Sequence, residues 1–186
     1  MKVSRRPQLH AIENAGLLES KFRRLVQNPE KIISRYIEPG MKVLDLGCGT
    51  GYFTTQIAKR LNDAGKVIAA DVQKGMLAIL AKKVEGFEFR ERIEILLCKN
   101  DRLSFNEKFD FILCFYSFHE MEYLDDIIQE IAHISKPYTK ILIAEQKFHV
   151  PKKLFLSFVE KMQMKGFKII ERPKIFLSRA VLMQYV

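Results

Sequence analysis

Hydrophobic runs of five to seven residues recur along the chain and alternate with longer segments in which apolar residues repeat at helical spacing. Runs of this length, rich in Val, Ile and Leu, are typical of strands buried on both faces of a sheet. They lie at residues 42–46, 66–71, 93–98, 109–115 and 140–144, and the helical segments between and after them at 51–62, 73–84, 124–134 and 151–164. This alternation predicts a mostly parallel α/β sheet with helices on both faces.

The two ends of the chain extend the pattern. Residues 13–36 have helical spacing in two pieces, and Pro29 opens the second piece. Residues 167–171 and 175–185 predict an antiparallel C-terminal hairpin. The expected fold is therefore a doubly wound, seven-stranded, mostly parallel sheet with that hairpin at its end.

No repeat, low-complexity segment or linker interrupts the pattern, and 186 residues suit one domain. We therefore expect a single domain over residues 1–186. The helical segment at residues 1–38 is expected to lie near the substrate side.

Three glycines follow the first predicted strand at alternate positions, Gly47, Gly49 and Gly51. Glycines between a strand and a helix permit a tight bend and a close approach of the backbone to a ligand. Asp45 precedes them, and its carboxylate would repel a pyrophosphate but suits a cationic or hydroxyl-bearing ligand. The spacing differs from the G-x-G-x-x-G of dinucleotide sites, because Tyr52 stands where the third glycine would be.

Polar residues also follow the later strands. Asp71 ends the second strand 20 residues after Gly51, where a carboxylate accepts the hydroxyls of a ribose. The alternative is an acid that stabilises the N-terminus of the next helix. Asn100 and Asp101 follow the third strand, and their alternative is an ordinary Asx turn.

A second distinctive stretch runs from Phe109 to Glu120, with the sequence Phe-Asp-Phe-Ile-Leu-Cys-Phe-Tyr-Ser-Phe-His-Glu. The strand ends near Phe115, so His119 and Glu120 are expected just beyond its carboxyl end. Ligands bind at that edge of a doubly wound sheet. His119 is therefore a candidate functional residue, although a lone histidine is more often structural.

The glycine turn, Asp71 and the run from Phe109 to Glu120 resemble class I methyltransferases that use S-adenosylmethionine. The last run is similar to that of the ubiquinone/menaquinone-biosynthesis-like group. The resemblance covers about residues 25–150 and implies a Rossmann-like methyltransferase fold. It also implies S-adenosylmethionine as cofactor and in-line methyl transfer to a small-molecule acceptor.

The resemblance implies a role for individual residues. Asp71 would bind the ribose, Val72 and Met76 would flank the adenine, and either Asn100 or Asp101 would bond its amino group. Further cofactor contacts are expected from Asp45, Gly47, Cys48, Gly49, Gly51, Tyr52, Phe115 and Tyr116.

His119 and Glu120 are expected to face the transferred methyl group. His119 is the best candidate for a base, because an unperturbed histidine titrates near neutrality. It is left open whether His119 acts as a base or only positions the substrate. Glu120 is an alternative partner for the amino group of the cofactor, or a cap for the next helix.

The net charge of +9 is concentrated at the two ends of the chain. Residues 147–186 hold nine Lys/Arg against two Asp/Glu, and residues 1–39 hold eight against four, whereas residues 40–146 are slightly acidic. A basic surface favours RNA or another acidic partner; the alternative is a solvated lysine-rich surface. An RNA or protein acceptor therefore stays open beside the small molecule.

The cysteines and the N-terminus bear on location. The three cysteines have no zinc-ligand spacing, no metal site is expected, and buried thiols in a reducing cytoplasm are the simplest interpretation. The first residues carry charges without an apolar stretch behind them, and no run is long enough to span a membrane. We expect a cytoplasmic protein; its oligomeric state is not predicted.

Two other functions compete with methyl transfer. An NAD-dependent dehydrogenase is disfavoured by the glycine spacing. A module that binds the cofactor without transferring its methyl group is also compatible with the same residues, because fold does not fix function.

Overall fold

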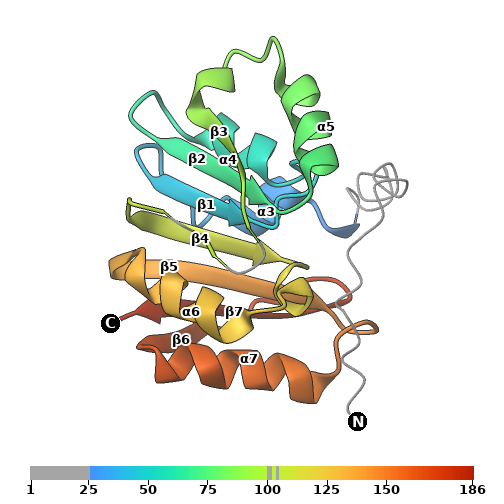
Figure 1. Cartoon of the computed structure of the whole chain (residues 1–186), viewed down its shortest axis with the longest axis vertical. Helices are drawn as coiled ribbons and strands as arrows, with labels where there is room; N and C mark the ends of the chain where they lie inside the picture. Colours follow the sequence, from blue (N-terminus) through green and yellow to red (C-terminus); the bar gives the residue numbers. More distant parts are fainter. Residues whose placement is uncertain (1–25, 100–101, 104) are drawn as a thin grey trace.

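The computed structural model describes residues 26–99, 102, 103 and 105–186. Within them, helices cover both faces of a seven-stranded sheet with the strand order β3-β2-β1-β4-β5-β7-β6 (Figure 1). Five strands pair in parallel, and the last two run antiparallel to their neighbours. The bounds are β1 (Lys42–Leu46), β2 (Lys66–Asp71), β3 (Ile93–Leu97), β4 (Phe109–Phe115), β5 (Ser135–Gln146), β6 (Phe167–Glu171) and β7 (Ser178–Tyr185). The predicted fold class is confirmed.

The helices form two layers, one on each face of the sheet (Figure 1). One layer holds α3 (Pro29–Ile33), α4 (Thr54–Arg60) and α5 (Lys74–Val84), and the other holds α6 (Leu124–His133) and α7 (Lys152–Met164). Two short 3-10 helices, η2 (Arg90–Arg92) and η3 (Phe118–Glu120), precede β3 and follow β4.

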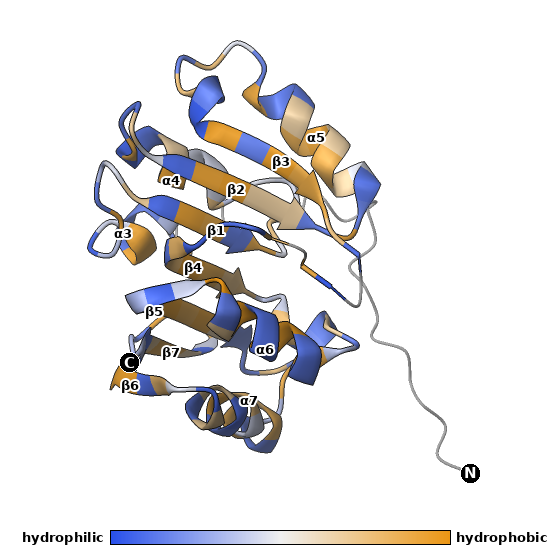
Figure 2. Ribbon diagram, turned by 60° about the vertical axis from the view of Figure 1, so that its left-hand side comes forward, coloured by the Kyte–Doolittle hydropathy of each residue, from blue (hydrophilic) through white to orange (hydrophobic). Residues whose placement is uncertain are grey.

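Successive residues of the central strands pack alternately against the two helix layers. In β4, Phe111 and Leu113 pack in the cluster that contains Ile57 of α4, whereas Ile112 packs in the cluster that contains Ile128 of α6. Both faces of the strand are therefore hydrophobic. Figure 2 shows hydrophobic residues along most of the length of β1 and β2 as well. This is why these strands appear in the sequence as continuous apolar runs.

Most predicted elements lie within a few residues of the observed ones, but the fifth strand differs. It was expected at residues 140–144 and begins at Ser135, which pairs with Phe109. The pairing register then shifts, and Tyr138 adopts a positive φ of 70°. Pro137 lies in this irregular stretch, where the lack of an amide proton is tolerated.

At the N-terminal end, Pro29 begins α3 as expected. Asn28 caps this helix, since its side chain accepts a hydrogen bond of 3.2 Å from the amide of Lys31. The first predicted helical piece, which begins at residue 13, lies outside the described residues as far as residue 25.

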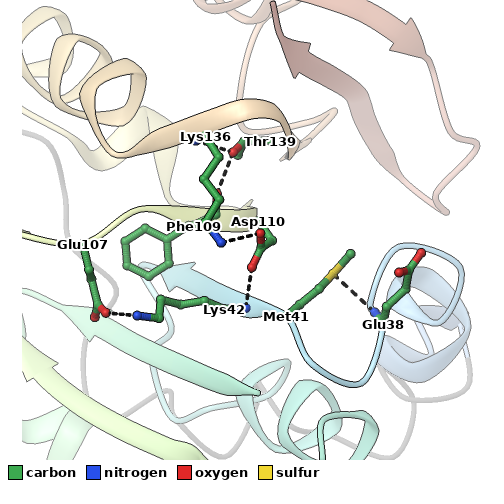
Figure 3. A network of polar contacts seen from close by, with 8 residues as sticks. All are labelled: Glu38, Met41, Lys42, Glu107, Phe109, Asp110, Lys136 and Thr139. Carbon is green, nitrogen blue, oxygen red and sulfur yellow. Dashed lines mark hydrogen bonds and ion pairs between the residues drawn. The ribbon is translucent and has the colours of Figure 1, made fainter. Parts of the chain in front are cut away.

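Asp110 is the single charged residue in the apolar run of β4, and its contacts explain why it is there. Its carboxylate accepts hydrogen bonds from the amide of Lys42 (2.8 Å) and the ammonium of Lys136 (2.6 Å), and Lys42 also pairs with Glu107 (Figure 3). Thr139 bonds the carbonyl of Phe109 in the same network at 2.6 Å. The starts of β1, β4 and β5 are thus tied together at the edge opposite to the strands' carboxyl ends.

The chain reverses its winding between β1 and β4. From β1 the sheet continues to β2 and β3 on one side and to β4 and β5 on the other. The loops that leave β1 and β4 therefore diverge, and a crevice opens between them. Ser117 approaches Gly47 so closely that a Cβ on Gly47 would lie 2.2 Å from the Ser117 Cβ. The hydroxyl of Ser117 also donates to the carbonyl of Leu46 at 2.8 Å.

This contact predicts that Gly47→Ala destabilises the protein more than a matched change at Gly86. Both glycines have a positive φ (74° and 79°), but a Cβ at Gly86 meets nothing within 4 Å. We expect a loss of about 3 kcal/mol for Gly47→Ala, from backbone strain plus overpacking, and about 1 kcal/mol for Gly86→Ala, from strain alone. Urea unfolding of both variants measures the difference, and equal losses would contradict the packing argument.

Candidate functional site

A cavity lies at the crevice between the loops that follow β1 and β4. Its empty volume is about 650 Å³, part of it open to solvent. Three acids from different elements reach its wall, together with backbone of the glycine turn and several aromatic rings. The lining residues are Asp45, Gly47, Cys48, Gly49, Thr50, Tyr52, Phe53, Asp71, Gln73, Met76, Phe115, Tyr116, Ser117 and Glu120.

The glycine turn is anchored to the end of β2. The amides of Gly47 and Cys48 donate to the carbonyl of Ala70 at 2.8 and 3.1 Å, and the amide of Gly49 donates to the carboxylate of Asp71 at 2.9 Å. A Cβ on Gly49 would meet no atom within 4 Å. The backbone at Gly49 therefore borders open space of the cavity, where a ligand has close access to it.

Asp71 lies between the glycine turn and the start of α5. One oxygen accepts from Gly49 and the other accepts a 2.8 Å hydrogen bond from the amide of Gln73, which precedes α5. Burial raises the pKa of this carboxyl, and the backbone hydrogen bonds partly offset that rise. Each carboxylate oxygen can accept a further hydrogen bond. Asp71 is thus placed both to stabilise the helix start and to receive hydroxyl groups in the cavity.

Asp45 is more deeply buried than Asp71. The residue is 3% exposed, and its carboxylate accepts a 2.6 Å hydrogen bond from the hydroxyl of Thr54 at the start of α4. Burial raises the pKa of Asp45 to about 7; the bond from Thr54 lowers it and the charge of Asp71 raises it further. Near neutrality this carboxyl is therefore poised between its two forms, and a cationic ligand would favour the charged form.

The wall contributed by β4 is held by contacts from both ends of the described chain. Tyr116 has a φ of 64°, an unusual conformation for a residue with a side chain. Its hydroxyl lies 2.5 Å from the hydroxyl of Ser178 in β7 and accepts a hydrogen bond from the side-chain amide of Gln27, which precedes α3. Strained backbone that persists under such bonding is a feature of functional sites.

Beyond Tyr116, η3 presents Glu120 to the cavity, whereas His119 is not among the lining residues. The imidazole Nδ1 of His119 lies 2.7 Å from the carboxylate of Glu145, at the carboxyl end of β5. Its Nε2 lies 3.9 Å from the carboxylate of Glu120. The two predicted catalytic residues are therefore neighbours, but only Glu120 borders the cavity.

The structure brings most of the predicted site residues together around one cavity. Three predicted residues in the described part of the chain do not line the cavity. His119 lies behind Glu120, Val72 is 36% exposed, and Gly51 lies against α5, where a Cβ on it would come 2.3 Å from a methyl carbon of Leu80. Asn100 and Asp101 lie outside the described residues.

Sequence reasoning missed several lining residues and the partner of His119. Thr50, Phe53, Gln73 and Ser117 lie within or next to the motifs, so their positions along the chain carried a signal. The sequence signal for Glu145 was weaker. Glu145 is an acid near the end of a buried strand, on the edge of the sheet where ligands bind.

Metal binding and membrane insertion find no support in the part of the chain that the structure describes. No group of three His, Cys, Asp or Glu side chains is arranged to hold a metal ion. No described helix has the length and apolar character needed to cross a bilayer. Cys48, Cys98 and Cys114 are free and buried, as expected.

A family model described as a methyltransferase domain matches residues 43–138. The chain belongs to this family. The match includes the glycine turn, Asp71 and the stretch from β4 to Glu120 that carried the resemblance. It confirms the expectation of a class I methyltransferase with S-adenosylmethionine as cofactor.

Individual proteins show the same relationship at lower identity. The chain is 27% identical to demethylmenaquinone methyltransferase of Bacillus cereus (strain ATCC 10987 / NRS 248) over 110 residues, which is 59% of this chain and 46% of that protein. The chain thus spans about half the length of the curated relatives it matches.

Solved structures share the fold. A SAM-dependent methyltransferase from Aquifex aeolicus superposes with a TM-score of 0.85 at 22% identity, over 96% of this chain and all of the other. The pre-rRNA processing protein fibrillarin from Methanococcus jannaschii gives 0.64 at 20% identity, over 80% of this chain and 67% of the other.

The residues of the cavity suit S-adenosylmethionine chemically. The cofactor carries ribose hydroxyls, a sulfonium and an ammonium group, and the wall offers the carboxylates of Asp71, Asp45 and Glu120. The open space at Gly49 lets the backbone approach it. Met76, 1% exposed, adds an apolar surface for a base.

The buried state of Asp45 predicts a specific pH dependence. The folded protein binds a proton at Asp45 up to about pH 7, whereas the unfolded chain releases it near pH 4. The contribution of Asp45 to stability is therefore present at low pH and is lost as pH rises from about 4 to about 7.

Relative to Asp45→Asn, the wild-type free energy of unfolding should fall by roughly 3 kcal/mol between about pH 4.5 and 8. Urea unfolding without cofactor measures this. Asp63→Asn, at a side chain that is 96% exposed, is the control. A constant difference between wild type and Asp45→Asn would show that Asp45 does not titrate in this range.

Proposed function

We propose that this domain transfers the methyl group of S-adenosylmethionine to a small-molecule acceptor. The observation that carries the proposal is the cavity at the winding reversal, where Asp71, Asp45 and Glu120 meet beside an open glycine backbone. A small acceptor is favoured by the similarity to demethylmenaquinone methyltransferases over the shared region.

In this proposal Asp71 receives the ribose hydroxyls, and Met76 packs against the adenine. Asp45 and Glu120 balance the positive charge of the methionine portion. Cys48, Tyr52, Phe115 and Tyr116 complete the wall around the cofactor. Val72, Asn100 and Asp101 remain candidates for the adenine side.

The bound cofactor supplies an already electrophilic methyl group, so the protein mainly provides alignment and a place for a proton. The wall formed by Phe115, Tyr116 and Ser117 limits access of water and fixes the direction of approach. Glu120 lies on the cavity wall with His119 behind it. These two residues are our candidates for handling the proton that the acceptor loses.

RNA is the second candidate acceptor, and a basic hollow beside the cavity favours it. Lys31, Arg35 and Lys174 border this hollow, although Arg35 is paired with Glu171. Gln27 also lines it and bonds Tyr116 of the cavity wall, so the hollow lies next to the site. Cations at such a place suit a phosphate backbone, and one protein of the same fold is a pre-rRNA processing protein.

A transfer assay with labelled S-adenosylmethionine tests the proposal. The panel holds hydroquinones, phenols and total RNA, and binding of S-adenosylhomocysteine is measured in parallel. We expect label in a small molecule, and for Asp71→Asn at least tenfold weaker binding, because hydrogen bonds to a charged group are worth about 1.5–3 kcal/mol. Asp63→Asn is the control and should bind normally.

The outcomes separate the candidates. Label in RNA alone would replace the small molecule by RNA. Tight binding with no label in any acceptor would favour a module that binds the cofactor without transfer. Normal binding by Asp71→Asn would remove Asp71 from the cofactor site.

A further inference from the structure

Glu145 is a carboxylate in an unusual place. It lies near the end of β5, an interior strand between β4 and β7, and none of its side chain is exposed. Burial of a carboxylate is costly unless hydrogen bonds and an opposite charge compensate it. The residue that bonds both carboxylate oxygens of Glu145 therefore helps to explain why this acid is buried in β5.

That residue is His119. Its amide donates to one oxygen of Glu145 at 3.1 Å, and its ring Nδ1 lies 2.7 Å from the other. A single carboxylate thus fixes both the main chain and the ring of His119. Because an ionised carboxylate only accepts hydrogen bonds, Nδ1 carries the proton of the neutral ring and Nε2 carries the lone pair.

The Nε2 atom of His119 lies near Glu120, which borders the cavity. Nε2 is buried, makes no hydrogen bond within the described residues, and lies 3.9 Å from the carboxylate of Glu120 on the cavity wall. The third titratable neighbour of His119 is His149, from the loop after β5. The two imidazole rings pack edge to face, with their centroids 4.8 Å apart. Burial lowers the pKa of His119, but Glu145 and Glu120 together raise it by more.

We propose that Glu145 is a positioning residue that holds His119 as the final proton acceptor of the methyl-transfer site, with Glu120 as the connection to the cavity. This inference rests on the proposed function. It also favours an acceptor that must lose a proton from oxygen, such as a phenol or a hydroquinone.

The acceptor oxygen forms a bond to the methyl carbon while the carbon–sulfur bond breaks, and that electron pair stays on sulfur. The O–H bond of the acceptor breaks, and its proton passes by way of the Glu120 carboxylate to Nε2 of His119. The positive charge lost at sulfur reappears on the imidazole, between two carboxylates.

The tautomer of His119 is measured first, by ¹⁵N NMR of the protein with S-adenosylhomocysteine, and needs no acceptor. We expect a protonated Nδ1 and a bare Nε2 at high pH, and a lower pKa of His119 in Glu145→Gln. His119→Gln removes the His119 resonances and so assigns them, and His133→Gln, on the exposed end of α6, is the control that leaves them in place. A protonated Nε2 in the neutral ring would overturn the proposal.

Kinetics follow with 1,4-dihydroxynaphthalene as the phenolic probe. Glu145→Gln should lower kcat by about 10²-fold with little change in the dissociation constant of S-adenosylhomocysteine. The acid limb of its pH profile should move to lower pH, which a purely structural role would not cause. Glu145→Asp should restore part of the rate, and Glu160→Gln, at an exposed glutamate of α7, should be neutral.

The results discriminate between the two proposals. An unchanged rate and pH profile in Glu145→Gln would overturn the role of Glu145 while transfer itself stands. If the wild type transfers label to neither this probe nor any acceptor of the panel, the proposed function fails together with the proton path. The NMR result would then describe only how His119 is held.

Discussion

The hydrogen bond from the amide of Gly49 to the carboxylate of Asp71 joins the two halves of the site. It holds the turn after β1 against the end of β2, where the carbonyl of Ala70 accepts two further amides of the same turn. The cavity exists because this turn is fixed on one side while β4 leads away on the other. The position of the glycine backbone, the start of α5 and the wall near Ser117 all depend on this attachment.

Contacts at the opposite edge of the sheet keep the central strands in register, and with them the attachment between the glycine turn and β2. Asp110 ties the amide at the start of β1 to a lysine at the start of β5 (Figure 3). Charged residues therefore secure the starts of the central strands, and the carboxyl ends are left to form the cavity. The acids there are buried at a cost in stability, and the raised pKa of Asp45 expresses that cost. A cationic ligand would offset it.

The sequence predicted the fold closely because both faces of the central strands are buried, and such strands are visible as apolar runs. The start of β5 was not visible, since Pro137 at a register shift resembles a break between elements. In the site, the residues close to the glycine turn could be predicted from the sequence motif. Glu145 was not, because its contact with His119 joins residues 26 positions apart and is created by the pairing of β4 with β5. The same limit applies to the Gln27–Tyr116–Ser178 contacts, which join the two ends of the described chain.

Together these features describe a methyltransferase domain, for which we propose a cofactor site built from backbone and acids and a proton path behind its wall. A crystal structure of the protein with S-adenosylhomocysteine tests this account most directly. We expect the ribose hydroxyls to bond Asp71, the backbone at Gly49 to contact the ligand, and the sulfur to face the wall between Phe115 and Glu120. A ligand bound elsewhere, or ribose hydroxyls bonded to other residues with Asp71 engaged only by backbone amides, would contradict it.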